Sequence, residues 1–165
     1  MSLAAGIIQE LEQEAAATRR VLERIPAEHF DWKPHPKSRT LGQLAMHLAT
    51  NPGGVTSVAM QNPVDLPNIV DTTPASTAEL MAALDASMAE ATTLLGGLSD
   101  AEITAHWIAR AGGVEVLAMP RHVFLRAVLL NHWYHHRGQL TVYLRLLDVP
   151  VPSIYGPSAD ENPFI

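Results

Sequence analysis

Residues 120–147 read PRHVFLRAVLLNHWYHHRGQLTVYLRLL. This stretch carries the longest helical pattern of the chain, because apolar side chains recur at intervals of three or four residues between Phe124 and Leu147. Pro120 stands at a first helical position, where its missing N–H is not needed, and Pro150 follows the end of the pattern. The sequence therefore predicts a long last helix from Pro120 to Leu147.

Three further helices are predicted upstream. Residues 3–24 have a helical apolar period, with acidic residues early and arginines late, as the helix dipole favours. Ser38 or Thr40 caps a second helix, and Ser76 opens a third helix that stops at Gly96 and the glycine after it. Four helices of this length predict an all-α fold, a four-helix bundle.

The second helix meets an interruption, Asn51-Pro52-Gly53-Gly54. Proline lacks the N–H that a helix interior uses, so we expect the helix either to kink there or to stop and restart toward Met60. Residues 62–75 contain three prolines and indicate an irregular connection to the third helix.

A small hairpin or irregular insert is expected before the last helix. Strand-like residues at Trp107–Ala109 and Val114–Val116 flank Gly112-Gly113, which suits a tight turn. Ser99 to Glu102 forms a possible capping box just before this insert. After the last helix, residues 149–165 have four prolines and no helical period, so the sequence predicts an extended C-terminal tail.

Composition limits the classes of function. The 165 residues fit a single domain, 1–165, and the net charge of −6 without a Lys/Arg cluster disfavours nucleic acid as a partner. There is no cysteine, so thiolate ligands and a protein-borne thiol nucleophile are excluded. The first residues lack the basic region of a signal peptide and no apolar run would span a membrane, so we expect no membrane association and a cytoplasmic location.

Histidines are the most informative polar residues. His132 and His136 lie four residues apart on the predicted last helix, the spacing with which helical zinc sites aim two ring nitrogens at one ion. His135 also shares this face, so spacing alone leaves open which of the two is the second ligand. His47, one turn after Leu44, is the best third ligand, although core histidines bonded to neighbouring groups are the competing interpretation. The remaining four have no partner at ligand spacing: His29, His35, His106 and His122.

Three segments resemble the DinB-like (DinB/YfiT) family. The first is Asn131–Leu140, followed by Tyr143–Arg145. The second is Trp32–Pro34 together with Ser38–Leu48, which reads SRTLGQLAMHL, and the third is Val151–Glu161. The resemblance covers almost the whole chain and implies a four-helix bundle with a three-histidine metal site. It assigns His132, His136 and His47 as the ligands and decides against His135. The break at Pro52 departs from the uninterrupted second helix of the family.

Three neutral imidazoles leave a position on the ion for water or substrate, as in catalytic sites. Imidazole suits several metals, and we expect one divalent transition metal ion, zinc or nickel first. The resemblance implies a metal-dependent transferase that uses a low-molecular-weight thiol with a small-molecule substrate, which fits the missing cysteine. The alternatives are a metal-dependent hydrolase and a non-catalytic metal-binding stress-response module.

The sequence also predicts where several residues near the three histidines lie. Arg137 is expected to point to solvent or to the tail, and Gln139 either to face the pocket or to bond backbone. We expect three aromatic residues at the entrance: Trp32, Trp107 and Tyr155. The last helix is apolar beyond the metal stripe, which with the family analogy predicts a homodimer through Val123, Leu130 and Trp133.

Overall fold

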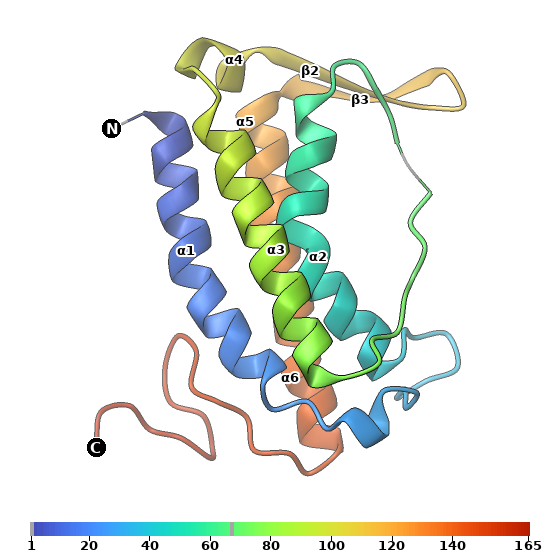
Figure 1. Ribbon diagram of the computed structural model, residues 1–165, viewed down its shortest axis with the longest axis vertical. Helices are drawn as coiled ribbons and strands as arrows, with labels where there is room; N and C mark the ends of the chain where they lie inside the picture. Colours follow the sequence, from blue (N-terminus) through green and yellow to red (C-terminus); the bar gives the residue numbers. More distant parts are fainter. Residues whose placement is uncertain (1, 67) are drawn as a thin grey trace.

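The computed structural model describes residues 2–66 and 68–165 (Figure 1). Its helices lie side by side, and the N-terminal α1 (Leu3–Leu22) packs on α3 (Thr77–Gly96), which in turn packs on α2 (Leu41–Met60). The last helical segment consists of α5, a π-helical stretch and α6, and it packs on α1 and α2. Its parts are Arg121–Phe124, Leu125–Asn131 and His132–Leu146. The four predicted helices are present, with ends shifted by a few residues.

Side-chain caps explain where the first three long helices begin. The Ser2 hydroxyl accepts from the backbone N–H of Ala5 at the start of α1, and Ser76 accepts from Glu79 at the start of α3. Thr40, rather than Ser38, caps α2, and Gln43 completes a reciprocal capping box with it. Each cap satisfies backbone donors that have no partner inside the helix.

The second helix continues through Pro52 as far as Met60, so the predicted stop and restart is wrong. A proline at this position removes the hydrogen bond to the carbonyl four residues earlier, which belongs to Leu48. The indole Nε1 of Trp133 donates to that carbonyl oxygen at 2.8 Å. A side chain of α6 therefore provides the donor that Pro52 lacks, and the helix needs no break.

Gly53 lets α2 and α3 approach closely. Its backbone N–H donates to the Ser87 hydroxyl of α3 at 2.8 Å, and a Cβ at this glycine would lie 3.0 Å from the Ser87 carbonyl oxygen. The same Cβ would lie 2.6 Å from Glu90 Oε2. At Gly54 a Cβ would meet nothing within 4 Å. Of these two adjacent glycines, only the first has a packing role.

A three-stranded sheet lies at one end of the helices (Figure 1). The antiparallel hairpin of β2 (His106–Ala111) and β3 (Val114–Pro120) is longer than predicted, and its turn residues Gly112 and Gly113 both have positive φ. The short β1 (Val64–Asp65) pairs in parallel with β2. This strand corrects the expectation of a wholly irregular connection over 62–75, and the fold is mostly helical with a small sheet rather than purely all-α.

Short helices complete the connections between the longer elements. The Ser99–Glu102 capping box opens α4 (Asp100–Thr104), and a single 3₁₀ turn spans Ala27–His29. Pro120 ends β3 and caps α5 instead of occupying a first helical position. Within the described ranges, no helix combines the length and the apolar character that crossing a membrane requires.

Leucine side chains from all the long helices form the core, and two of the apolar residues expected at a dimer surface belong to it. Leu130 and Trp133 are buried within the chain, and only Val123, at 41% exposure, faces outward. These two apolar side chains of the last helix are therefore covered by other parts of the same chain. Fully buried leucines include Leu11, Leu22, Leu48, Leu80, Leu84, Leu95, Leu125, Leu129 and Leu140.

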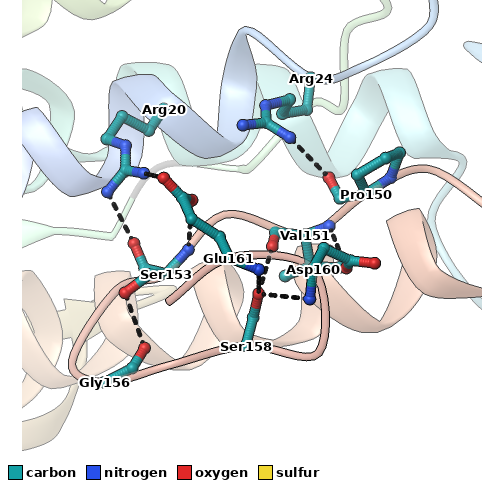
Figure 2. A network of polar contacts seen from close by, with 9 residues as sticks. All are labelled: Arg20, Arg24, Pro150, Val151, Ser153, Gly156, Ser158, Asp160 and Glu161. Atoms are coloured by element: carbon teal, nitrogen blue, oxygen red, sulfur yellow. Dashed lines mark hydrogen bonds and ion pairs between the residues drawn. The ribbon is translucent and has the colours of Figure 1, made fainter. Parts of the chain in front are cut away.

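The C-terminal tail has no helix or strand and doubles back on itself (Figure 2). Asp160 accepts from the backbone N–H of Val151, and Glu161 accepts from that of Ser153, each at 2.8 Å. Arg20 of α1 donates to the Ser153 carbonyl oxygen at 2.8 Å and pairs with Glu161 at 2.5 Å. The bonds of Arg20 attach the tail to the C-terminal end of α1.

The two glycines of α2 give a stability test. We expect Gly53→Ala to lower the free energy of unfolding by about 1–3 kcal/mol, because the added methyl group overpacks the contact with α3. Gly54→Ala is the matched control and should raise it by about 0.5–1 kcal/mol, since alanine favours the helix and meets no neighbour. Urea unfolding measures both. Equal effects of the two substitutions would contradict the close approach at Gly53.

Candidate metal centre

Three histidines from two helices converge on one point. His47 lies in the first half of α2, His132 begins α6, and His136 follows one turn later. The Nε2 atom of His132 lies 3.1 Å from that of His47 and 3.0 Å from that of His136. All three ligand atoms lie within 4.8 Å of one another, so this group is able to hold a metal ion. His135 is exposed and is not part of the group.

Burial keeps these imidazoles neutral. Desolvation, helped by the positive charge of Arg39, lowers the pKa of His47 to about 4. Desolvation likewise lowers the pKa of His136 to about 4, against the opposing effect of its hydrogen bond to Gln139, and it also lowers the pKa of His132. At neutral pH the site therefore presents uncharged ring nitrogens, the protonation state that ligation requires.

Gln139 determines which nitrogen of His136 is free. Its side-chain oxygen Oε1 lies 2.7 Å from His136 Nδ1. An amide oxygen only accepts, so His136 carries its proton on Nδ1 and directs the Nε2 lone pair toward the other histidines. Gln139 was expected either to face the pocket or to bond backbone, and the structure shows instead that it contacts His136 of the histidine group.

Hydrogen bonds among the three imidazoles do not pair all of their facing ring nitrogens. His132 Nε2 lies within hydrogen-bonding distance of two ring nitrogens, but a single proton on it points at only one of them. The alternative, bare lone pairs facing one another, is repulsive. A cation accepts all three lone pairs at once, and neighbouring nitrogens in a tetrahedral zinc site lie about 3.3 Å apart. The residues present therefore fit a three-histidine metal site.

A π-helical segment, Leu125–Asn131, comes directly before His132. Such segments have i→i+5 hydrogen bonds and wider turns than the α-helix, and they are frequent at functional sites. Each residue of a π-helix turns the chain about the helix axis by a smaller angle than in an α-helix. The segment therefore changes the direction in which the α6 histidines point relative to the side chains of α5. The predicted helix over 120–147 therefore has two helical types and not one uninterrupted period.

A cavity of about 390 Å³ has His47 as one of its wall residues. Besides the histidine, its polar wall residues are Thr50 and Asn51 of α2. The other walls are apolar and come from α2, the last helical segment, β3 and the connection around β1: Val55, Val58, Leu66, Ile69, Leu117, Phe124 and Val128. A smaller cavity of about 90 Å³ also borders His47 and includes Asp71. The site is therefore open to a small molecule with a largely apolar body.

Arg39 and Asp71 are charged neighbours of the site that the sequence did not single out as functional. Arg39 Nε donates to Asp71 Oδ1 at 2.7 Å. The positive charge of Arg39 lowers the pKa of all three histidines, whereas Asp71 raises that of His47. Arg39 precedes the Thr40 cap and Asp71 lies in the connection after β1, so neither has a periodic relation to the histidines.

The aromatic residues expected at the entrance line neither cavity. Trp107 is fully buried and stacks on Phe124 with ring centroids 4.0 Å apart. Trp32 packs edge-on against Tyr143 at 5.7 Å. The Tyr155 hydroxyl donates to Glu14 at 2.7 Å. These side chains serve core packing and attachment of the tail.

The sequence also led to expectations for Arg137 and for the four histidines outside the group. Of the two directions expected for Arg137, solvent or the tail, the structure shows the tail: its guanidinium contacts Tyr155, is only 2% exposed and pairs with Glu14 at 2.6 Å. Three of the remaining histidines are exposed, and the fourth, His122, is half-buried; the exposed ones are His29, His35 and His106.

Fold and site together define a mostly helical protein with a candidate three-histidine metal centre. A model of the DinB family matches residues 1–162. The chain belongs to the DinB family.

Relatives support this assignment. The chain is 28% identical over 157 residues to the YrdA protein of Bacillus subtilis (strain 168), which is described as uncharacterized; the match covers 93% of this chain and 89% of YrdA. A solved DinB-like protein from Bacillus cereus ATCC 10987 is 24% identical with a TM-score of 0.72, over 92% of this chain and 97% of that one. The DinB-like protein YjoA of Bacillus subtilis is 18% identical with a TM-score of 0.66, over 90% and 97%. Both solved structures share the fold.

The lowered pKa values predict how stability depends on pH. Between about pH 6.5 and pH 4 the unfolded chain protonates its histidines while folded His47 and His136 stay neutral, so the free energy of unfolding of metal-free protein should fall as the pH falls. When unfolding is measured with a chelator present, these two histidines should take up about two protons as the chain unfolds. His136→Asn should reduce it by about one proton, and His135→Asn, at an exposed neighbour, should not. An unchanged slope in His136→Asn would contradict the neutral buried site.

Proposed function

We propose that the protein binds one divalent transition metal ion through His47, His132 and His136, and that it is a metal-dependent transferase acting on a small molecule with a low-molecular-weight thiol. The convergence of three ring nitrogens next to a cavity of about 390 Å³ carries this proposal. Zinc or nickel is the expected ion, because imidazole nitrogen suits both. Membership of the DinB family is consistent with it.

The ligand set supports catalysis rather than a closed structural site. When bound, a divalent ion held by three neutral ligands supplies a Lewis acid that favours the deprotonated form of a thiol or a water. The chain contributes orientation: Gln139 holds the proton of His136 on Nδ1, so the Nε2 lone pair faces the site. The apolar cavity walls limit the access of water to the reacting groups.

The absence of cysteine is compatible with a thiol that arrives with a cosubstrate, and it does no more than permit this reading. In such a transfer the thiol sulfur forms a bond to an electrophilic carbon of the acceptor while the bond from that carbon to its leaving group breaks. The leaving group takes the electron pair of the broken bond, and the thiol proton passes to solvent or to the leaving group. Arg39 adds positive potential near the histidines, which favours an anionic sulfur.

Hydrolysis is less well supported by the charged groups around the site. The described group of potential ligands contains histidines only, and a hydrolase needs a general base or acid near the ion. Asp71 borders the smaller cavity beside His47, but its carboxylate is already engaged by Arg39 at 2.7 Å.

The first test is metal content. We expect about one transition metal ion per chain in protein purified without a histidine tag, and loss of it in His47→Ala, His132→Ala and His136→Ala, because each removes one of three ligands. His135→Ala is the matched control, since that residue adjoins the site but lies outside the group. Elemental analysis with circular dichroism measures content and folding. Full retention of metal in folded His132→Ala would exclude this site.

The second test is thiol chemistry. Cobalt-substituted protein is incubated with mycothiol, bacillithiol, glutathione or cysteine, together with generic electrophiles. We expect a sulfur-to-cobalt charge-transfer band with one thiol class and conjugate formation that falls at least about a hundredfold in His136→Ala. His135→Ala should keep both signals. If no thiol changes the cobalt spectrum of metal-loaded protein, the transferase proposal fails and the non-catalytic module is favoured.

A further inference from the structure

Two cavities of unlike chemistry adjoin one another at the histidine group. They share three wall residues, His47 and Thr50 of α2 and Ile69 of the connection after β1. The remaining walls of the larger cavity are almost wholly apolar. The smaller cavity, of about 90 Å³, adds three polar side chains: Gln43, Asp71 and Thr72. A ligand that extends from one cavity into the other would therefore meet apolar walls first and polar walls beyond His47.

Gln43 contributes an accessible N–H donor to the smaller cavity. It lies four residues before His47 on α2, so the two side chains project from the same side of the helix. Its Oε1 accepts from the Thr40 N–H at 2.9 Å as part of the capping box, which fixes the orientation of the amide. Its NH₂ group has no partner among the described residues. The buried polar atoms that lack partners belong to other residues, so this NH₂ group is open to a ligand.

Asp71 contributes an acceptor to the same cavity. Arg39 Nε donates to its Oδ1 at 2.7 Å, and no group of the described chain donates to its Oδ2 in this way. The side chain is 31% exposed, so a small molecule is able to reach it. A carboxylate bound by an arginine still accepts further hydrogen bonds, because each of its oxygens has two acceptor positions. The smaller cavity thus combines a donor from α2 with an acceptor from the connection.

This pair of groups selects a neutral ligand group. An anion would bring only acceptors to the Asp71 carboxylate and would be repelled by it. An ammonium group would bring only donors to the NH₂ group of Gln43, and the positive charge of Arg39 lies close by. A carboxamide meets both requirements, since its oxygen accepts from Gln43 and its nitrogen donates to Asp71.

The size of the cavity agrees with this choice. About 90 Å³ corresponds to the share of liquid volume that roughly three water molecules occupy. The carbon, oxygen and nitrogen of one amide group fill such a space. A single hydroxyl also donates and accepts, but its one oxygen would fill only about a third of it.

We propose that the smaller cavity is a second binding subsite, in which Gln43 and Asp71 recognise a neutral carboxamide of a ligand whose apolar part lies in the larger cavity. The ligand class that follows is a small molecule with an apolar body and an amide group at one end. As a statement about the substrate the inference rests on the proposed function, but binding of the amide does not itself require the metal.

A matched pair of probes tests the inference. Hexanamide and 2-heptanone have the same shape and the same carbonyl acceptor, but only the amide has N–H donors. We expect hexanamide to bind roughly tenfold tighter, because it gains a hydrogen bond to a charged acceptor. NMR titration of purified protein of measured metal content gives both affinities, and the side-chain NH₂ signals of Gln43 should shift. Asp71→Ala should abolish the preference, and its survival in that variant would overturn the inference.

Gln43→Glu tests the donor without removing the helix cap. Glutamate keeps an oxygen for the Thr40 N–H, as capping boxes commonly do, but replaces the NH₂ group with a second acceptor. Both probes should bind at least about fivefold more weakly, since each brings its carbonyl oxygen to this position. Gln9→Glu, at an exposed position of α1, is the matched control for the added charge and should bind both probes as the unmodified protein does. Unchanged binding in folded Gln43→Glu would refute the subsite.

The metal-site variant His136→Ala separates this inference from the proposed function. The preference for hexanamide should persist in it, because the amide binds Gln43 and Asp71 and not the metal. Loss of the preference in His136→Ala together with retention in Asp71→Ala would place the amide at the histidines and overturn the inference. If the preference depends on Asp71 but no thiol transfer occurs, the subsite stands and the proposed chemistry fails.

Discussion

One hydrogen bond, from the Trp133 indole to the Leu48 carbonyl oxygen, underlies the geometry of the site. Trp133 is the residue after His132 and Leu48 is the residue after His47. The bond therefore fixes the height at which the histidine-bearing turns of α2 and α6 face one another. The carbonyl is free to accept it because Pro52, four residues later, has no N–H. A proline inside a helix thus helps to set the relative height of two histidines.

Uncharged groups surround the ligand nitrogens most closely. The histidines are neutral because of their burial, Gln139 contacts His136 as a neutral amide, and the cavity wall is mainly apolar. An ion in this position would keep its positive charge largely uncompensated, which favours an anionic ligand from solution. Arg39 acts in the same direction, and Asp71 partly balances it.

Local signals in the sequence were sufficient for the helices and for a pair of histidines. Capping residues such as Ser76 and the apolar period predicted the helical elements, and the spacing of His132 and His136 placed two rings on one face. Spacing left His135 open, because only tertiary packing exposes it. The course of α2 through Pro52 depended on a side chain 81 positions later along the chain, where Trp133 lies. The apolar period of the sequence also did not predict the π-helical segment, because the turns of a π-helix are wider than those of the α-helix.

The cavity combines two kinds of element. Part of its wall belongs to the helical segments that bear the histidines, whereas Leu66, Ile69 and Leu117 come from the connection around β1 and from the hairpin. Side chains on these outer elements are able to change in size without moving a ligand nitrogen. Under the proposed function, this arrangement separates reactivity from selectivity: exchange of residues in a loop and a hairpin alone would direct one metal chemistry to different acceptors.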